Sequence, residues 1–308
     1  MAIDATPLPN CHRRERQSGA FPLLAIVGSL LAVSVLLSRV AAGLHAPMLT
    51  YLTLAMGGSG AVLTILNGGI GRSESGAGAL VAYSFAAGGL MALASALGYL
   101  TVHKVGAAFI SLALAFPPML TWLLSIILSM ERFDTFRFCG LVTGLAGGVL
   151  LALGKGLGAP SDLGAILVAC AMPAVLALGN VFRTRFWPRG ARPRQLAGAM
   201  LISGAVLTLP FAIALEGTDA AANVFQTPML LVLLVAIATF VAQYAAFFRL
   251  QQVAGPVYLS QIGSVAAMVG SPIAVFALGE HWPDGFTLAA VLIVGGLVLF
   301  QYRTFTSR

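Results

Sequence analysis

Apolar stretches long enough to cross a bilayer recur along nearly the whole chain, and this repetition constrains the fold more than any other feature. A transmembrane helix needs about 20 consecutive apolar residues. Short polar segments separate ten such stretches, at about 21–38, 47–66, 77–100, 105–129, 135–153, 162–182, 196–215, 228–248, 256–278 and 285–302. The residues left over are too few for a soluble domain. The sequence therefore predicts an all-α membrane protein with ten transmembrane helices.

Composition supports this prediction and excludes an ordinary soluble protein. Hydrophobic residues make up 59% of the chain and charged residues only 9%, whereas a soluble domain carries about 25% charged residues. The formal net charge of +7 raises the alternative of nucleic-acid binding. The placement of the basic residues argues against that alternative, so we expect a lipid bilayer and no nucleic acid as partner.

The basic residues gather on one side of the predicted bundle. With the N-terminus in the cytoplasm, three of the 17 basic residues fall on the outer side: Arg39, Lys104 and Lys155. The other 14 fall on the cytoplasmic side, many of them in the loop 183–194. Short cytoplasmic loops carry an excess of Lys and Arg. We therefore expect a multi-pass protein of the cell (inner) membrane with both termini in the cytoplasm.

The chain reads as two halves of similar design. Val105–Leu153 holds an apolar helix with Pro117-Pro118, a charged hinge at 130–134 and a glycine-rich helix, and Val253–Tyr302 repeats this order around a hinge at 279–284. Five helices per half is an odd number, so the second half must be inverted relative to the first. Such a pair is typical of transporters.

These boundaries give the predicted organisation of the chain. Residues 1–19 are expected to form a disordered cytoplasmic tail, 20–154 the first five-helix repeat and 155–160 a connecting loop. Residues 161–303 form the second repeat, and 304–308 a short cytoplasmic tail.

Several of these features resemble the EamA-type exporters of the drug/metabolite transporter superfamily. The resemblance rests on the ten-span length, the Gly279-Glu280 junction with its counterpart Met130-Glu131, and the glycines of the fifth and tenth spans, Gly140–Gly148 and Gly295-Gly296. It covers about 20–303. It implies an exporter of amino acids or other small metabolites, with a substrate cavity between the halves. It also implies that the fifth and tenth helices pack at the periphery, near a half-to-half or subunit contact, in a monomer or homodimer.

Polar and aromatic residues near mid-depth are the candidate lining of that cavity. Two adjacent prolines remove two backbone donors, so a kink or break is expected at Pro117-Pro118, and freed carbonyl groups are tolerated where they border a cavity. A plain kink, or hydrogen bonding between helices, remains the alternative for several of these residues. The predicted substrate-binding residues are Tyr83, Phe116, Pro117, Gln243, Tyr244, Tyr258, Gln261 and Ser264. The predicted hinge or gating residues are Pro118, Glu131 and Glu280, with capping or ion pairing as the alternative for the two glutamates.

Charged residues are missing from the middle of every predicted helix. All ten acidic residues and the four histidines fall at helix ends, in loops or in the tail. An ionised group at the bilayer centre costs at least about 2.5–3.5 kcal/mol and would mark function. We therefore expect cavity walls without formal charge and a neutral or zwitterionic substrate. The alternative is the export of lipophilic, drug-like compounds.

The sequence contains no set of residues that indicates catalysis or cofactor binding. An enzyme would need clustered carboxylates, metal ligands, or a nucleophile with its base at membrane depth. The three cysteines, Cys11, Cys139 and Cys170, show no metal-like spacing. We expect a transporter of a small molecule, and neither an enzyme nor a protein that carries a metal or cofactor.

Overall fold

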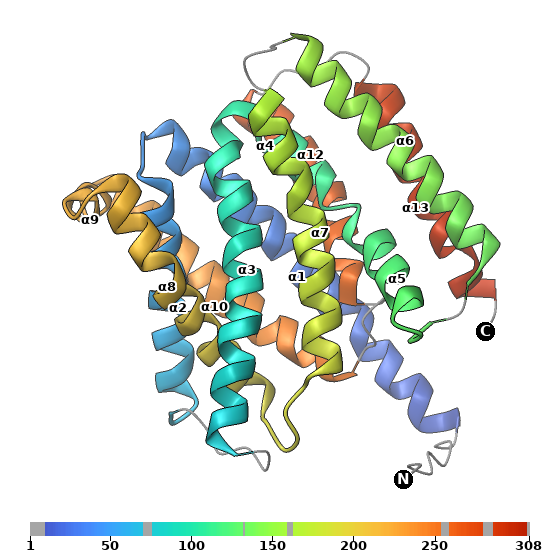
Figure 1. The fold of residues 1–308 in the computed structure, drawn as a ribbon, viewed down its shortest axis with the longest axis horizontal. Coiled ribbons are helices and arrows are strands. Elements are labelled where there is room, and N and C mark those ends of the chain that lie inside the picture. Colours follow the sequence, from blue (N-terminus) through green and yellow to red (C-terminus); the bar gives the residue numbers. More distant parts are fainter. Residues whose placement is uncertain are drawn as a thin grey trace.

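The computed structural model describes residues 10–69, 76–131, 133–158, 163–253, 259–279 and 286–306, and in these ranges it contains helices and no strands. Figure 1 shows them as one bundle. The helices are α1 (Asn10–Gly43), α2 (Met48–Leu66), α3 (Ala77–Val105), α4 (Ala107–Ala113), α5 (Pro117–Ile127), α6 (Thr135–Gly158), α7 (Leu163–Arg185), α8 (Pro193–Glu216), α9 (Ala220–Val224), α10 (Met229–Val253), α12 (Ile262–Leu278) and α13 (Phe286–Thr306).

Seven of the described helical segments are long and apolar enough to cross a membrane: Ala20–Gly43, Met48–Leu66, Ala77–Val105, Ala107–Ile127, Leu163–Arg185, Pro193–Glu216 and Met229–Gln252. Three shorter apolar stretches, Thr135–Leu150, Ile262–Leu278 and Thr287–Phe300, lie where three further spans were predicted. Large apolar side chains such as Ile65, Leu215 and Phe276 are exposed. The helical ranges that the structure describes, with their exposed apolar side chains, are compatible with a multi-pass membrane protein.

Two helix boundaries bear on the sequence predictions. α1 begins at Asn10, inside the segment that was predicted to be a tail, and continues through Pro22. The predicted break before the paired prolines is confirmed, since α4 ends at Ala113 and α5 starts at Pro117. Leu114, Ala115 and Phe116 form turns between the two helices. Their N–H groups donate to carbonyls three or four residues earlier in the chain.

The break fits closely against α12. A Cβ atom built at Gly263 would overlap the Leu114 carbonyl oxygen. Two turns further along α12, a Cβ atom at Gly270 would lie 2.5 Å from Ser111 Oγ. Because glycine has no Cβ, α12 can approach the broken helix to within backbone contact. The break between α4 and α5 therefore packs directly against α12.

Glycines also bring α6 and α13 together along one side of the molecule, on the right in Figure 1. A Cβ atom on Gly296 would lie 2.5 Å from Gly144 N and 2.6 Å from Gly140 O, which places the two backbones in direct contact. This is the packing expected of small residues spaced four apart. A Cβ atom on Gly140 would likewise meet the α13 backbone, at Gly296 O and Phe300 N, whereas Cβ atoms on Gly144 and Gly148 would meet the side chains of Met119 and Phe116.

Aromatic side chains fill the space around this pair and within the bundle. Trp122 is fully buried, and its ring meets Phe300 edge-on with centroids 5.7 Å apart. The Trp122 side chain therefore packs inside the bundle and does not face lipid. Tyr51 and Phe248 are likewise buried, so the core runs through the whole bundle.

Candidate functional site

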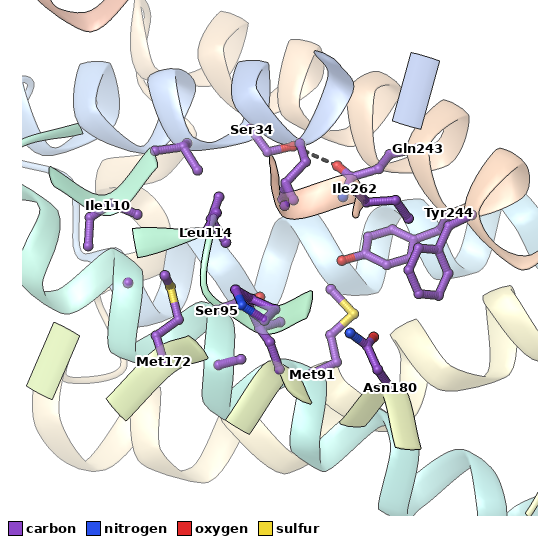
Figure 2. A pocket seen from close by; sticks show the side chains of 18 of the residues that line it. Ser34, Met91, Ser95, Ile110, Leu114, Met172, Asn180, Gln243, Tyr244 and Ile262 are labelled. Atoms are coloured by element: carbon purple, nitrogen blue, oxygen red, sulfur yellow. Dashed lines mark hydrogen bonds between the residues drawn. The ribbon is translucent and has the colours of Figure 1, made fainter. Parts of the chain in front are cut away.

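A cavity of about 110 Å³ lies between six helical segments near the centre of the bundle. Its walls come from α1, α3, the α4–α5 break, α7, α10 and the start of α12. Figure 2 shows the Tyr244 ring pointing into this space from one side, with Asn180 and Met91 approaching from the other. The volume accommodates several water molecules. Most of the wall is apolar, formed by side chains such as Leu31, Ile110, Leu114, Met172 and Phe240.

A hydrogen bond between two helices forms part of the polar wall. Ser34 Oγ on α1 donates to Gln243 Oε1 on α10 across 2.9 Å (Figure 2). Both residues are buried, with exposed fractions of 4% and 3%. Ser34 Oγ also lies 3.0 Å from the Leu30 carbonyl oxygen of its own helix. The bond ties α1 to α10 while leaving the amide nitrogen of Gln243 for another partner.

Tyrosine rings form a second part of the wall. Tyr99 lines the cavity and stacks on Tyr51, with ring centroids 6.0 Å apart. Tyr244 lines the cavity from α10 and packs edge-on against Phe240 at 5.6 Å. Rings with hydroxyl groups present an apolar face and a polar edge to the same ligand. The cavity therefore suits a molecule with both apolar and polar parts.

Arg183 overturns the expectation that these walls carry no formal charge. It lines the cavity from the last turns of α7 and is only 4% exposed. Its Nη2 donates to Asn180 Oδ1 at 2.7 Å, and its Cζ lies 5.2 Å above the centre of the Phe247 ring. The sequence prediction counted Arg183 with the basic loop because the apolar run stops just before it. In the structure α7 continues to Arg185 and draws Arg183 inward.

Three of the predicted substrate-binding residues line this cavity: Pro117, Gln243 and Tyr244. Two others are buried without forming its wall. Tyr83 stacks on Phe182 with centroids 5.8 Å apart, and its hydroxyl donates to the Arg183 carbonyl oxygen at 3.4 Å. Phe116 faces α6, where a Cβ atom on Gly148 would lie 2.5 Å from its ring.

The predicted substrate-binding residues of the ninth span that the structure describes do not line the central cavity. Gln261 is buried at the N-cap of α12 without forming the cavity wall, and Ser264 lines a second cavity of about 210 Å³ between α4, α12 and α13. That second cavity is almost wholly apolar. The residues of this segment that face the central cavity are Ser260 and Gly263, together with Leu259 and Ile262. Tyr258 lies outside the described residues.

The predicted gating residues lie away from the cavity or outside the described part. Glu131 pairs with Arg137 at 3.2 Å on a partly exposed surface, which is the ion-pair alternative that the sequence left open. Pro118 is buried in the first turn of α5. Glu280 lies outside the described residues. In the parts of the chain that the structure describes, no three His, Cys, Asp or Glu side chains gather into a metal-binding group.

Several residues of the cavity were not predicted from the sequence. Ser34, Ser95, Tyr99, Asn180 and Arg183 all contribute polar groups to it. The spacing of Met172, Leu176, Asn180 and Arg183 could have revealed the α7 face, because steps of four, four and three residues follow one side of a helix.

Comparison with known proteins supports the fold alone. No family model and no curated protein sequence matches the chain. Fifteen chains of solved structure resemble it. One of them, described only as "Crystal structure of protein", superposes with a TM-score of 0.58 at 20% sequence identity, and the match covers 90% of this chain and 94% of the other. The similarity therefore extends over nearly the whole of both folds.

Proposed function

We propose that the protein is a secondary membrane transporter that exports, or facilitates the movement of, a small metabolite such as an amino acid. The observation that carries the proposal is the central cavity, which has polar groups on an otherwise apolar wall and draws its lining from both halves of the chain. In transporters built from inverted repeats, substrate sites lie at the repeat interface near the bilayer midplane. We also propose that the protein is related to the EamA-type exporters and is located in the inner cell membrane.

The pattern of helix contacts supports ten spans arranged as two inverted repeats. A pseudo-two-fold axis would exchange α1, α2, α3, α4–α5 and α6 with α7, α8, α10, α12 and α13. Three of the five exchanged pairs are in extensive contact with each other: α2 with α8, α4 with α12 and α6 with α13. Other contacts occur in pairs that the rotation would exchange. The contact of α3 with α7 corresponds to that of α10 with α1, and the contact of α3 with α8 to that of α10 with α2. The contact of α1 with α12 corresponds to that of α7 with α5. One rotation accounts for all of these contacts.

The cavity follows the same exchange. Its walls come from α1, α3 and α4–α5 in the first half, and from their counterparts α7, α10 and α12 in the second. α2, α6, α8 and α13 contribute nothing to it. A site shared equally by two inverted halves opens to opposite sides when the halves rock against each other, which is alternating access.

The arrangement of the termini supports the proposed topology. α1 begins and α13 ends toward the lower right of Figure 1. α7 also descends toward the lower part of that view, and it ends at the basic residue Arg185. An excess of Arg on one side marks the cytoplasmic face. This arrangement supports the proposal that both termini lie in the cytoplasm.

The largely apolar wall is the observation that favours the second candidate function, export of lipophilic compounds. The hydrogen-bonding groups of Ser34, Asn180, Gln243 and Tyr244 favour a polar metabolite instead. A purely apolar ligand would leave polar groups such as the Tyr244 hydroxyl and the Gln243 amide nitrogen without partners, at a cost of about 1–3 kcal/mol for each.

Counterflow of labelled amino acids into proteoliposomes tests the proposal. A Ser95→Phe substitution adds a ring at the cavity wall on α3, whereas Leu93→Phe adds it two residues away at a side chain that is 50% exposed. We expect uptake by the wild type and by the Leu93→Phe variant, and loss of uptake in the Ser95→Phe variant at similar thermal stability. Equal uptake by both variants would refute transport through this cavity. Uptake of lipophilic compounds alone would favour the second candidate.

A further inference from the structure

Arg183 is a buried cation whose charge no carboxylate in the described part of the chain balances. It is 4% exposed, and its Nη2 donates a hydrogen bond to a neutral amide, Asn180 Oδ1, at 2.7 Å. Its Nε is buried and has no hydrogen-bond partner. Buried charges in proteins are normally paired, because an unpaired one loses its hydration without compensation. The lack of a charged partner for Arg183 among the described residues therefore needs an explanation.

The position of the side chain supplies one. Arg183 and Asn180 lie three residues apart on α7 and both line the central cavity. We propose that the two residues form a subsite that binds the carboxylate group of the transported molecule. This inference rests on the proposed transport function, and it names the chemical group that the cavity recognises.

The geometry of the guanidinium suits this role. Arginine presents five N–H donors in a planar fork that matches the two oxygens of a carboxylate. Asn180 Oδ1 accepts a hydrogen bond from one of these N–H groups and holds the guanidinium in place. The Phe247 ring on α10, with its centre 5.2 Å from Cζ, packs against the guanidinium. The Nε–H group has no partner in the protein, so the hydrogen-bonding capacity of the guanidinium is not filled. A ligand carboxylate would complete both the charge balance and the hydrogen bonding.

The rest of the cavity selects a carboxylate over a phosphate. Arg183 is the single cationic residue in the described lining of the cavity. A phosphate group at neutral pH carries nearly two negative charges, which one arginine does not balance. The remaining wall offers hydroxyl groups, the Gln243 amide and apolar surface such as Leu31, Met172 and Phe240. The site therefore fits a small molecule with one carboxylate and a partly apolar body, a class that includes amino acids and simple organic acids.

A topological role alone does not account for the burial of Arg183. Arg185, two residues later on the same helix, is exposed and marks the cytoplasmic side without entering the bundle. The hydrogen bond of Arg183 to Asn180 lies within one helix, so it does not join α7 to a neighbour. Among the described contacts of the Arg183 side chain, the ring contact with Phe247 is the one that crosses between helices.

A series of matched ligands tests the inference on the wild-type protein. Leucine and 4-methylpentanoate carry a carboxylate on the same branched body, and leucinol replaces that carboxylate with an alcohol. Binding to purified protein is measured by isothermal titration calorimetry and by the rise in melting temperature. We expect leucine and 4-methylpentanoate to bind, and leucinol to bind at least about tenfold more weakly, since hydrogen bonds to charged groups contribute about 1.5–3 kcal/mol.

Variants assign this preference to the proposed residue. Arg183→Gln should remove the preference for carboxylates, Arg183→Lys should retain part of it, and the control Arg185→Gln should leave it unchanged. The inference is overturned if leucinol binds wild type as tightly as leucine, if neither carboxylate binds, or if a folded Arg183→Gln variant keeps the full preference. Counterflow of leucinol by the wild type would then leave the transport function standing without a carboxylate subsite.

Discussion

The contact between α6 and α13 predicts opposite outcomes for two adjacent glycines. A Cβ atom on Gly296 would lie 2.5 Å from Gly144 N, 2.6 Å from Gly140 O and 2.8 Å from Gly144 Cα. All three atoms belong to the backbone, so no side-chain rotation relieves the overlap. A Cβ atom on Gly295 would meet nothing within 4 Å. The two glycines lie on the same helix, but Gly295 has room for an added methyl group and Gly296 does not.

The size of the effect follows from these distances. Restoring an ordinary contact of about 3.5 Å requires the helices to separate by roughly 1 Å, which forfeits a quarter to a half of the dispersion energy at the contact. Overpacking of this kind costs about 1–3 kcal/mol. Alanine regains about 1 kcal/mol over glycine within a helix. We expect Gly296→Ala to destabilise the protein by up to about 2 kcal/mol and Gly295→Ala to stabilise it slightly.

Thermal unfolding of the two purified variants in the same detergent, at one scan rate, measures this difference. The melting temperature of Gly296→Ala should fall below that of the wild type, and that of Gly295→Ala should equal or exceed it. If Gly296→Ala melted at the same temperature as Gly295→Ala, or above it, the backbone contact between α6 and α13 would be refuted.

Two further contacts give predictions of the same kind. Glu216 accepts hydrogen bonds from Leu49 N, Thr50 N and Thr50 Oγ1 at 2.7–2.8 Å at the N-terminus of α2. Glu216→Gln should therefore lower the stability measured by thermal unfolding by about 1–3 kcal/mol. The control Asp219→Asn, at an exposed residue, should change stability little, and equal effects of the two substitutions would contradict the capping role of Glu216. Gly263→Ala places a methyl group against the Leu114 carbonyl oxygen, so both melting temperature and counterflow should fall, by about 1–3 kcal/mol for stability; an unchanged melting temperature would contradict the contact.

The sequence predicted the features that depend on local chemistry. Hydropathy placed a span at 47–66, and α2 runs from Met48 to Leu66. The missing donors of Pro117-Pro118 predicted the break between α4 and α5. The resemblance to a family implied that the fifth and tenth helices pack near a half-to-half or subunit contact, but it did not identify α6 and α13 as each other's partners.

Features that depend on how each helix is rotated could not be predicted in the same way. Gln261 and Ser264 are polar, and they were expected to face the cavity, but Ser260 and Gly263 face it instead. A shift of one residue turns a helix by about 100°, and an apolar sequence with few polar groups leaves that rotation open. Arg183 was missed because a hydropathy window ends at a charge, whereas the hydrogen bonds of α7 continue beyond it.

Access to the cavity from each side of the membrane tests the central claim most directly. Ser95→Cys, in a protein whose Cys11, Cys139 and Cys170 are replaced by serine, places one thiol at the cavity wall. A membrane-impermeant maleimide is applied to either side of vesicles with known protein orientation. Alternating access predicts labelling from both sides, with rates that change in opposite directions when a transported ligand is added. Labelling from one side only, under every condition, would contradict the account.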